Sequence, residues 1–557
     1  MRFVDTDVLV IGAGAAGLFA AIRASEFTED VALLEKATLR SGGNLAIGHY
    51  EGGINPMTKV PGGPTSKQFA EMYLTSSSGL TGVENPMDKY IIGEEIVDRV
   101  KDLENWGMKI ICKKDGTWAT RWNYKIGERM ESGISIYGGT LKPAMVSQLR
   151  KTKVKVFERT MAVDLLTHDG SVVGAVALNT RTGEVTAFRA KATVLATGST
   201  SRSFIVTPGR NWFWMRDMMT NTGDGHGMAY RAGAELTLME FLRTDHMFCN
   251  VMANTYGGVC RNALGEEFLE ESYKKLQSRV WTMQWEFLQG RGPCYWDARK
   301  MTEEELKRRE WNIKEKSLPD TMCKSAYEER GLDPRKDFGE IRMMPVGLLG
   351  GPDYDEKAAT TLKGLYAAGD LCWMDSMSNA FVFGHRAGEY AAKHALESEP
   401  PTVDEEQAKG IEDAIQAYTK RKDGISSLEL EEKVRSIMTY YVGYHKTGGM
   451  LKRGLELLLE MKEKFLPKVY ARNPHELMRT VELRSIFDVV EMHIKSSLMR
   501  NESRTGGRHF HHRLDYPDPD PEWYRQRIAI RREDGEMKLF KKLAPPQELP
   551  ESLKEEK

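Results

Sequence analysis

The sequence predicts an α/β protein with α+β inserts, in which a parallel-sheet domain is interrupted by a capping insert and followed by a helical bundle and an extended tail. Three observations predict this class. The short apolar run VLVI leads through GAGAAG into the helical segment LFAAIRASE. Strand-like segments then return in two widely separated parts of the chain. From about residue 403 onward, long helical patterns replace them.

The N-terminal segment has the pattern of a β–α–β unit. VLVI is a continuous apolar run, as expected for a buried parallel strand. Gly12, Gly14 and Gly17 have the spacing G-x-G-x-x-G, which allows a tight turn, close approach of a pyrophosphate and close helix packing. Glu35 ends the next strand, VALLE, at the distance where an acid accepts from a ribose hydroxyl. This unit predicts a Rossmann-like dinucleotide site.

Later strands place the domain boundaries. KVKVFERTMAVDLL, SVVGAVALN and TAFRAKATVLATG are separated by the turn segments HDGS and TRTGE, which predicts hairpins. The strand LKGLYAAGD follows only after a long gap, so an insert must interrupt the domain. The expected organisation is a dinucleotide domain in two parts, 1–234 and 346–402, a capping domain at 235–345, a helical bundle at 403–500 and a C-terminal arm at 501–557.

Two further turns indicate which dinucleotide is bound. Thr197-Gly198 ends the strand in VLATGS, and Gly369-Asp370 ends LKGLYAAGD. Such turns are typical of FAD-dependent oxidoreductases, in which the acid meets the ribityl chain or the pyrophosphate. The sequence lacks a second G-x-G-x-x-G for NAD(P)H, so nicotinamide is not expected as the electron source. The predicted cofactor is FAD.

The helical region consists of four long patterns, of which the last begins at NPHELMR. Asn473 is a plausible N-cap there, and Pro474 stands at the first helical position. These patterns predict a small bundle.

Composition limits the partners. Lys and Arg number 79 against 80 Asp and Glu, which argues against nucleic acid or an anionic membrane as the main partner. The N-terminal segment has no signal-peptide pattern, and its uncharged stretch is too short to span a bilayer, so we expect a cytoplasmic protein without direct membrane insertion. None of the six cysteines forms a C-x-x-C pair, so no metal or iron–sulfur cluster is expected in this chain.

Four stretches together resemble a known superfamily: EKATLRSGGN, TGDGHGMAYRAGAEL, LKGLYAAGD and ESRTGGRHFHHRLDYP. They resemble the flavoprotein subunits of fumarate reductase, succinate dehydrogenase and adenylylsulfate reductase, and the resemblance covers nearly the whole chain. Further stretches look most like the adenylylsulfate reductase alpha subunit: NWGMKIICKKDGTW, EFLQGRGPCYWDARK, ARNPHELMR and MKLFKKL.

The resemblance implies how FAD is held. The backbone of the turn at 41–44 would face the flavin and its phosphates, and Ser378-Asn379 would lie at the pyrimidine end. Gly42 stands where many succinate dehydrogenases carry a flavin-linked His, so FAD is expected to be non-covalent. The expected cofactor-binding residues are Gly12, Gly14, Ala15, Ala16, Gly17, Glu35, Lys36, Ser41, Gly42, Gly43, Asn44, Ala162, Ala196, Thr197, Gly198, Asp224, Gly369, Asp370, Ser378 and Asn379.

Only some of the substrate-binding residues of the resembling enzymes have counterparts in this sequence. Arg279 resembles the catalytic Arg of fumarate reductases, Arg243 could contact an anion, and Trp212 or Trp214 could stack on a nucleotide. However, Val280 replaces the Asp that commonly follows the catalytic Arg. The His-Pro-Thr-Gly segment and the later Arg of a dicarboxylate clamp are absent as well. The stretch MMPVGLLGGPD also lacks the His expected for adenylylsulfate reductase.

Several functions remain open on this basis. The first is a flavoprotein subunit that exchanges electrons between a small anionic substrate at the flavin N5 and a separate iron–sulfur, ferredoxin-like subunit. The alternatives are an electron-transfer or scaffold flavoprotein without its own substrate, and a true fumarate reductase or succinate dehydrogenase. His509, His511 and His512 resemble a metal cluster, but their basic neighbours favour a basic loop.

Overall fold

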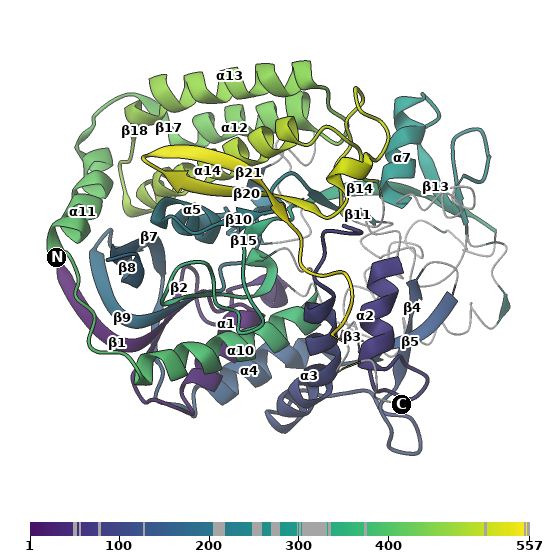
Figure 1. Cartoon of the computed structure of the whole chain (residues 1–557), viewed down its shortest axis with the longest axis horizontal. Helices are drawn as coiled ribbons and strands as arrows, with labels where there is room; N and C mark the ends of the chain where they lie inside the picture. The colour runs from purple at the N-terminus through teal and green to yellow at the C-terminus, as the bar shows by residue number, and fades with distance from the viewer. Residues whose placement is uncertain are drawn as a thin grey trace.

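A computed structural model shows the architecture (Figure 1). The residues that it describes are 1–47, 53–54, 57–75, 80–125, 128–203, 218–247, 259–268, 279–297, 299, 302–303, 331, 336–372, 376–505, 509–550 and 553.

The main sheet has the order β6-β2-β1-β9-β8-β7, and β16 pairs with β9. Parallel pairing joins five of its strands, β6, β2, β1, β9 and β16. The predicted hairpins are the antiparallel pairs β7–β8 and β8–β9. The bounds are β1 (Arg2–Ile11), β2 (Val31–Glu35), β6 (Lys155–Glu158), β7 (Thr160–His168), β8 (Ser171–Asn179), β9 (Val185–Leu195) and β16 (Leu365–Ala367).

Alternate residues of β1 enter two different cores, because successive side chains of a strand point to opposite faces. Val8 and Val10 pack with the first core, which contains residues of α1, α3, α4 and α10. Leu9 and Ile11 pack with the second core, which contains residues of α5 and of the C-terminal helices. The sheet is therefore covered on both faces. The helices are α1 (Ala15–Ala24), α3 (Pro86–Asn105), α4 (Leu141–Leu149), α5 (Asp224–Ala232) and α10 (Met377–Leu396).

A second sheet lies within the segment expected as a cap. Its order is β12-β13-β14-β11-β19, with α7 against it. The elements are β11 (Leu242–Met247), β12 (Val259–Arg261), α7 (Arg279–Leu288), β13 (Cys294–Asp297), β14 (Phe338–Leu348) and β19 (His509–Phe510). The last strand comes from the C-terminal segment, so distant parts of the chain build this sheet together. The chain also forms α2 (Ser66–Thr75) and a small sheet of β3 (Gly53–Ile54), β4 (Thr120–Lys125) and β5 (Glu128–Ser135).

The helical layer contains α11 (Glu405–Lys420), α12 (Ser427–Ile437), α13 (Gly448–Lys464) and α14 (Pro474–Met499). The predicted start of α14 is confirmed, because the Asn473 side chain accepts a hydrogen bond from the Glu476 N–H at 2.9 Å. Most of α14 is buried, and it packs on α5. Two short strands of this region, β17 (Ile425–Ser426) and β18 (Val469–Tyr470), pair in parallel.

The C-terminal segment is not simply an extended arm. Its strands β20 (Gln526–Glu533) and β21 (Glu536–Leu543) form an antiparallel hairpin. Asp534 and Gly535 join them with positive φ angles of 50° and 82°, a turn that the dipeptide Asp-Gly favours. β20 pairs with β10 (Leu236–Thr237), which also pairs with β15 (Gly351–Pro352). β10 therefore lies outside the cap sheet, although the cap was expected to begin at residue 235.

Within the described part of the chain, no helix is both long enough and apolar enough to cross a membrane.

Candidate functional site: a dinucleotide pocket at the ends of the parallel strands

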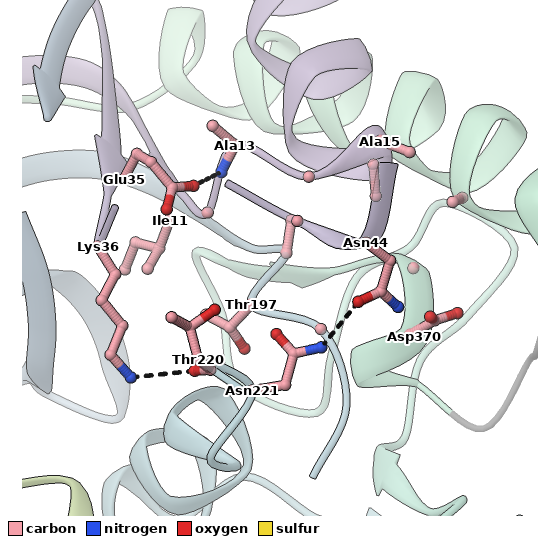
Figure 2. Close-up of a pocket in the computed structure, with 18 of the residues that line it drawn as sticks. Ile11, Ala13, Ala15, Glu35, Lys36, Asn44, Thr197, Thr220, Asn221 and Asp370 are labelled. Carbon is pink, nitrogen blue, oxygen red and sulfur yellow. Dashed lines mark hydrogen bonds between the residues drawn. The ribbon is translucent and has the colours of Figure 1, made fainter. Parts of the chain in front are cut away.

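A pocket lies at the carboxyl ends of β1, β2, β9 and β16, where α/β sheets bind ligands (Figure 2). It contains about 950 Å³ of empty space, including its open mouth. Most of the predicted cofactor residues line it: Gly12, Gly14, Ala15, Ala16, Glu35, Lys36, Gly43, Asn44, Ala162, Ala196, Thr197, Gly198, Asp224, Gly369 and Asp370.

The three motif glycines have different surroundings. Gly12 has φ +104°, and a Cβ there would lie 2.4 Å from the Ala196 carbonyl oxygen. A Cβ on Gly17 would lie 1.7 Å from the Gly12 carbonyl oxygen, so Gly17 serves helix packing and does not line the pocket. A Cβ on Gly14 would meet nothing within 4 Å, so its backbone faces open space. These surroundings match the roles that the motif predicts for its glycines.

Glu35 holds the turn of the motif in place. Its carboxylate accepts a hydrogen bond from the Ala13 N–H at 2.8 Å (Figure 2). It also accepts one from the Ala37 N–H at 2.7 Å. The side chain of Lys142 donates to the Ala13 carbonyl. Burial lowers the pKa of Lys142 to about 8, and Glu35 partly offsets this effect. A carboxylate can accept further bonds beyond these two, so Glu35 still fits a ribose contact.

The turn at 41–44 differs from the prediction. Ser41 is exposed, and its hydroxyl hydrogen-bonds with the Thr38 hydroxyl at 2.6 Å. A Cβ on Gly42 would lie 2.4 Å from the Glu35 carboxyl carbon. Gly42 thus packs against Glu35, and neither Ser41 nor Gly42 lines the pocket. Of this turn, only Gly43 and Asn44 line the pocket, because Gly42 packs against the side chain of Glu35.

The start of α10 also lines the pocket through residues other than those predicted. Ser378 and Asn379 are buried but do not line it, whereas Ser376, Met377 and Ala380 do. Helical periodicity explains the difference, since residues three apart share a face and their intervening neighbours point elsewhere. The Ser376 hydroxyl accepts the Asn379 N–H at 3.0 Å and caps the helix.

Two asparagines meet on the wall of the pocket. The Asn44 side-chain oxygen accepts from the Met218 N–H at 2.8 Å and lies 3.5 Å from the Asn221 side-chain nitrogen (Figure 2). Asn221 was not predicted, although it directly precedes the TGDG stretch. The other lining residues that the sequence did not single out are Ile11, Ala13, Leu34, Leu45, Thr160, Met161, Thr220, Met228 and Ala368. Most of them adjoin predicted residues, a proximity that could have identified them.

Among the predicted substrate residues, Arg243 lies beside Asp370, a residue that lines the pocket. Arg243 lies on β11, is 2% exposed, and places Nη1 at 3.6 Å from Asp370 Oδ2. Arg279 begins α7, but its side chain lies outside the described residues. Trp212 and Trp214 also lie outside them.

The histidines of the C-terminal segment do not form a basic loop. His511 and His512 are buried, and the Nδ1 atom of each ring has a hydrogen-bond partner inside the protein. His512 Nδ1 is 2.6 Å from His445 Nδ1, so one ring donates and the other accepts. Burial, together with nearby Lys446, lowers the pKa of His512 to about 4. In the part of the chain that the structure describes, no group of His, Cys, Asp and Glu could hold a metal ion.

The residues of the pocket fit FAD. Gly14 leaves space for a pyrophosphate at the N-terminus of α1. The Thr197 hydroxyl lines the pocket, is buried, and has no hydrogen-bond partner among the described residues. Glu35 stands at the end of β2 with spare acceptor capacity. These groups suit a phosphate, a polar cofactor edge and a ribose hydroxyl, respectively.

Comparisons with known proteins agree with this site. Residues 7–380 match the family described as "FAD binding domain", and residues 431–551 match "Fumarate reductase flavoprotein C-term". The "Fumarate reductase flavoprotein subunit" of a Serratia species is 27% identical and covers 92% of this chain and 90% of its own length. The protein of the same description from Escherichia coli is 25% identical over 97% of this chain and 94% of its own length.

Solved structures show the same fold. Adenylylsulfate reductase from Archaeoglobus fulgidus superposes with a TM-score of 0.83 at 23% identity, covering 98% of this chain and 96% of that one. The chain belongs to the FAD-binding family that its residues 7–380 match. It is an FAD-dependent oxidoreductase, and its relatives include flavoprotein subunits of fumarate reductases.

Proposed function

We propose that this flavoprotein subunit moves electrons between a small anionic substrate and a separate iron–sulfur protein of the ferredoxin type. Bound FAD supplies the redox chemistry, since its ring exchanges an electron pair with a substrate and single electrons with a carrier. The observation that carries the proposal is the position of Arg243. A buried guanidinium on the cap sheet stands beside the pocket acid Asp370.

The roles of the residues follow from that position. Arg243 carries a permanent charge and a planar set of donors, which suits an oxyanion. Asp370 lies close enough to hold the guanidinium at the edge of the pocket. The cap strands β11 and β14 pair over six residues beside it. A cap that closes over the flavin would exclude water from the reacting groups. Polar donors prearranged in such a place favour an anionic substrate and the charge that develops on it.

The electron partner is supported by the sequence and by the relatives. None of the cysteines has the spacing of an iron–sulfur cluster, and the chain has one G-x-G-x-x-G motif rather than two. The relatives from Serratia and Escherichia coli are both named as subunits. A chain of this kind needs another protein to bring or remove electrons.

The test is anaerobic flavin spectroscopy on the purified chain. The flavin is reduced with dithionite, excess reductant is removed, and reoxidation is followed with adenylylsulfate, fumarate or an α,β-unsaturated acyl thioester. Sulfite with AMP is added to the oxidised flavin in a separate experiment. We expect one anionic compound to change the flavin spectrum at a saturable rate that Arg243→Gln lowers roughly 10²–10³-fold. Rapid reduction by NADH would contradict the proposal.

A second candidate is an electron-transfer flavoprotein without its own substrate. Val280 and the absence of His from 343–353 favour it, because both positions depart from substrate residues of the resembling enzymes. In that case none of the compounds would change the flavin spectrum, whereas a reduced ferredoxin would still reduce the flavin.

A further inference from the structure

Lys36 joins the wall of the cofactor pocket to a helix behind it. Its Nζ lies 2.6 Å from Asp224 Oδ2 and 3.1 Å from both the Thr220 carbonyl oxygen and the Thr222 hydroxyl. Lys36, Thr220 and Asp224 line the pocket. Figure 2 shows the bond between Lys36 and Thr220 on that wall. One ammonium group therefore holds together the end of β2, the segment before α5 and the start of α5.

The same ammonium has another anionic neighbour that lies outside the pocket. Glu482 of α14 places Oε1 2.6 Å from Lys36 Nζ. The Glu482 side chain is 1% exposed and does not line the pocket. Burial opposes its charge, but Arg202 and Lys36 together lower its pKa to about 2. Burial likewise opposes the charge of Lys36, and Asp224 and Glu482 nevertheless raise its pKa.

Glu482 also holds a second segment of the pocket. Its Oε2 lies 2.6 Å from Arg202 Nη2, and Arg202 follows the pocket turn at 196–198 in the chain. Arg202 in turn makes a two-pronged pair with Glu431 of α12, at 2.8 and 2.9 Å. Buried ion pairs therefore connect the helical layer with two segments. Lys36 belongs to the segment after β2, and Arg202 belongs to the segment after β9.

We propose that Glu482 is a positioning residue for the cofactor: it sets Lys36, and through Lys36 the pocket wall, so that docking of the helical layer and binding of FAD stabilise each other. Without the Glu482 charge, Lys36 would be drawn to Asp224 alone. The wall segment at 220–224 would then shift, although Lys36 and Arg202 would each keep one acidic partner. Two events that stabilise the same arrangement are coupled reciprocally.

The experiment compares Glu482→Gln with a control on the same helix. Asp488 of α14 is also buried, and it pairs with Arg231 at 2.7 Å and with Lys462 at 3.2 Å. None of these three residues lines the pocket. Asp488→Asn therefore removes a buried charge from the same helix without removing the partner of a residue that lines the pocket.

Apoprotein of each variant is titrated with FAD, and the dissociation constant is read from quenching of flavin fluorescence. Thermal unfolding is measured with and without FAD. We expect both variants to lower the Tm of the apoprotein, and Glu482→Gln alone to weaken FAD binding, by about tenfold or more for a displaced charge-assisted contact. The increase in Tm that FAD produces should shrink in Glu482→Gln and stay unchanged in Asp488→Asn.

A double-mutant cycle separates positioning from a general loss of stability. If Glu482 acts through Lys36, Glu482→Gln should change the FAD dissociation constant little in a Lys36→Met background. An undiminished effect in that background, or equal FAD affinity in Glu482→Gln and wild type, would overturn the proposal. Should Glu482→Gln fail to fold, Glu482→Asp keeps the charge but withdraws it from Lys36, and the same expectations apply to it.

Discussion

Arg243 on the cap strand β11 lies 3.6 Å from Asp370, measured from Nη1 to Oδ2, and Asp370 lines the dinucleotide pocket. The pair connects the cap sheet with the turn that follows β16. A cation is thereby held, almost fully buried, at the edge of the cofactor site.

Replacing Arg243 should impair catalysis more than cofactor binding. Arg243→Gln removes the charge that would meet the anionic substrate, so the rate of substrate-dependent flavin reoxidation should fall roughly 10²–10³-fold. Flavin content should remain near one per chain. Stopped-flow absorbance measures both. Arg261→Gln is a matched control in the same sheet, because Arg261 pairs with Asp297 away from the pocket. Normal reoxidation in Arg243→Gln would remove Arg243 from the substrate site.

Replacing Glu35 should weaken FAD binding. Glu35→Ala removes the acceptor for the Ala13 and Ala37 N–H groups and for a ribose hydroxyl. The loss should be roughly 1.5–3 kcal/mol of binding free energy. Fluorescence titration of the apoprotein checks this value. The control is Glu158→Ala on the adjacent strand β6. Glu158 stands opposite Glu35 in the strand register, and its side chain likewise accepts a hydrogen bond from a backbone N–H, that of Leu39. Equal FAD affinity in the two variants would contradict the assignment.

The position of Gly42 predicts non-covalent FAD. A side chain there would meet the Glu35 carboxylate rather than the cofactor. Acid precipitation of the protein should therefore release the flavin into the supernatant. Gly42→His should lower flavin content without creating a covalent bond, because the imidazole would displace Glu35. Gly139→Ala, where an added Cβ meets nothing within 4 Å, should leave flavin content unchanged. A fluorescent flavin band on a denaturing gel would refute the prediction.

Buried histidines predict that stability falls in mild acid. Burial lowers the pKa of His226 to about 4, against an ordinary value of 6.5. Between these two pH values the unfolded chain binds a proton that the folded chain does not. The free energy of unfolding should therefore decrease as pH drops from 6.5 to 4, by about 1.4 kcal/mol per pH unit for each such histidine. His512 contributes in the same direction.

Urea unfolding at several pH values measures this dependence. His226→Asn should flatten the slope below pH 6.5, whereas His475→Asn, at an exposed position, should not. A slope that is the same in wild type and His226→Asn would show that this histidine is already protonated in the folded protein.

Local patterns in the sequence were sufficient for the β–α–β unit, the hairpins of β7 to β9 and the start of α14. Gly17 is required by the carbonyl oxygen of Gly12, five residues earlier in the same motif. Asn473 caps α14 through a bond to the third residue of that helix. Such features follow from covalent geometry and short-range hydrogen bonding, so spacing alone predicts them.

Other features depend on packing. Gly42 was expected at the flavin and instead packs on Glu35, since the direction of the turn is set by the acid beneath it. Ser378 and Asn379 lie at the start of α10, as expected, although neither lines the pocket. His511 and His512 are buried because β19 joins β11 in the cap sheet, which no local pattern indicates.

By itself, the sequence determined that this protein is an FAD-dependent flavoprotein with a dinucleotide unit and a helical region, because those properties reside in contiguous motifs. Only the tertiary structure decided which distant side chains meet. Arg243 reaches Asp370, and Glu482 reaches Lys36, through strand register and helix packing. These pairings depend on the whole fold, because a shift of one residue in β11 or a different rotation of α14 would point each side chain away from its partner.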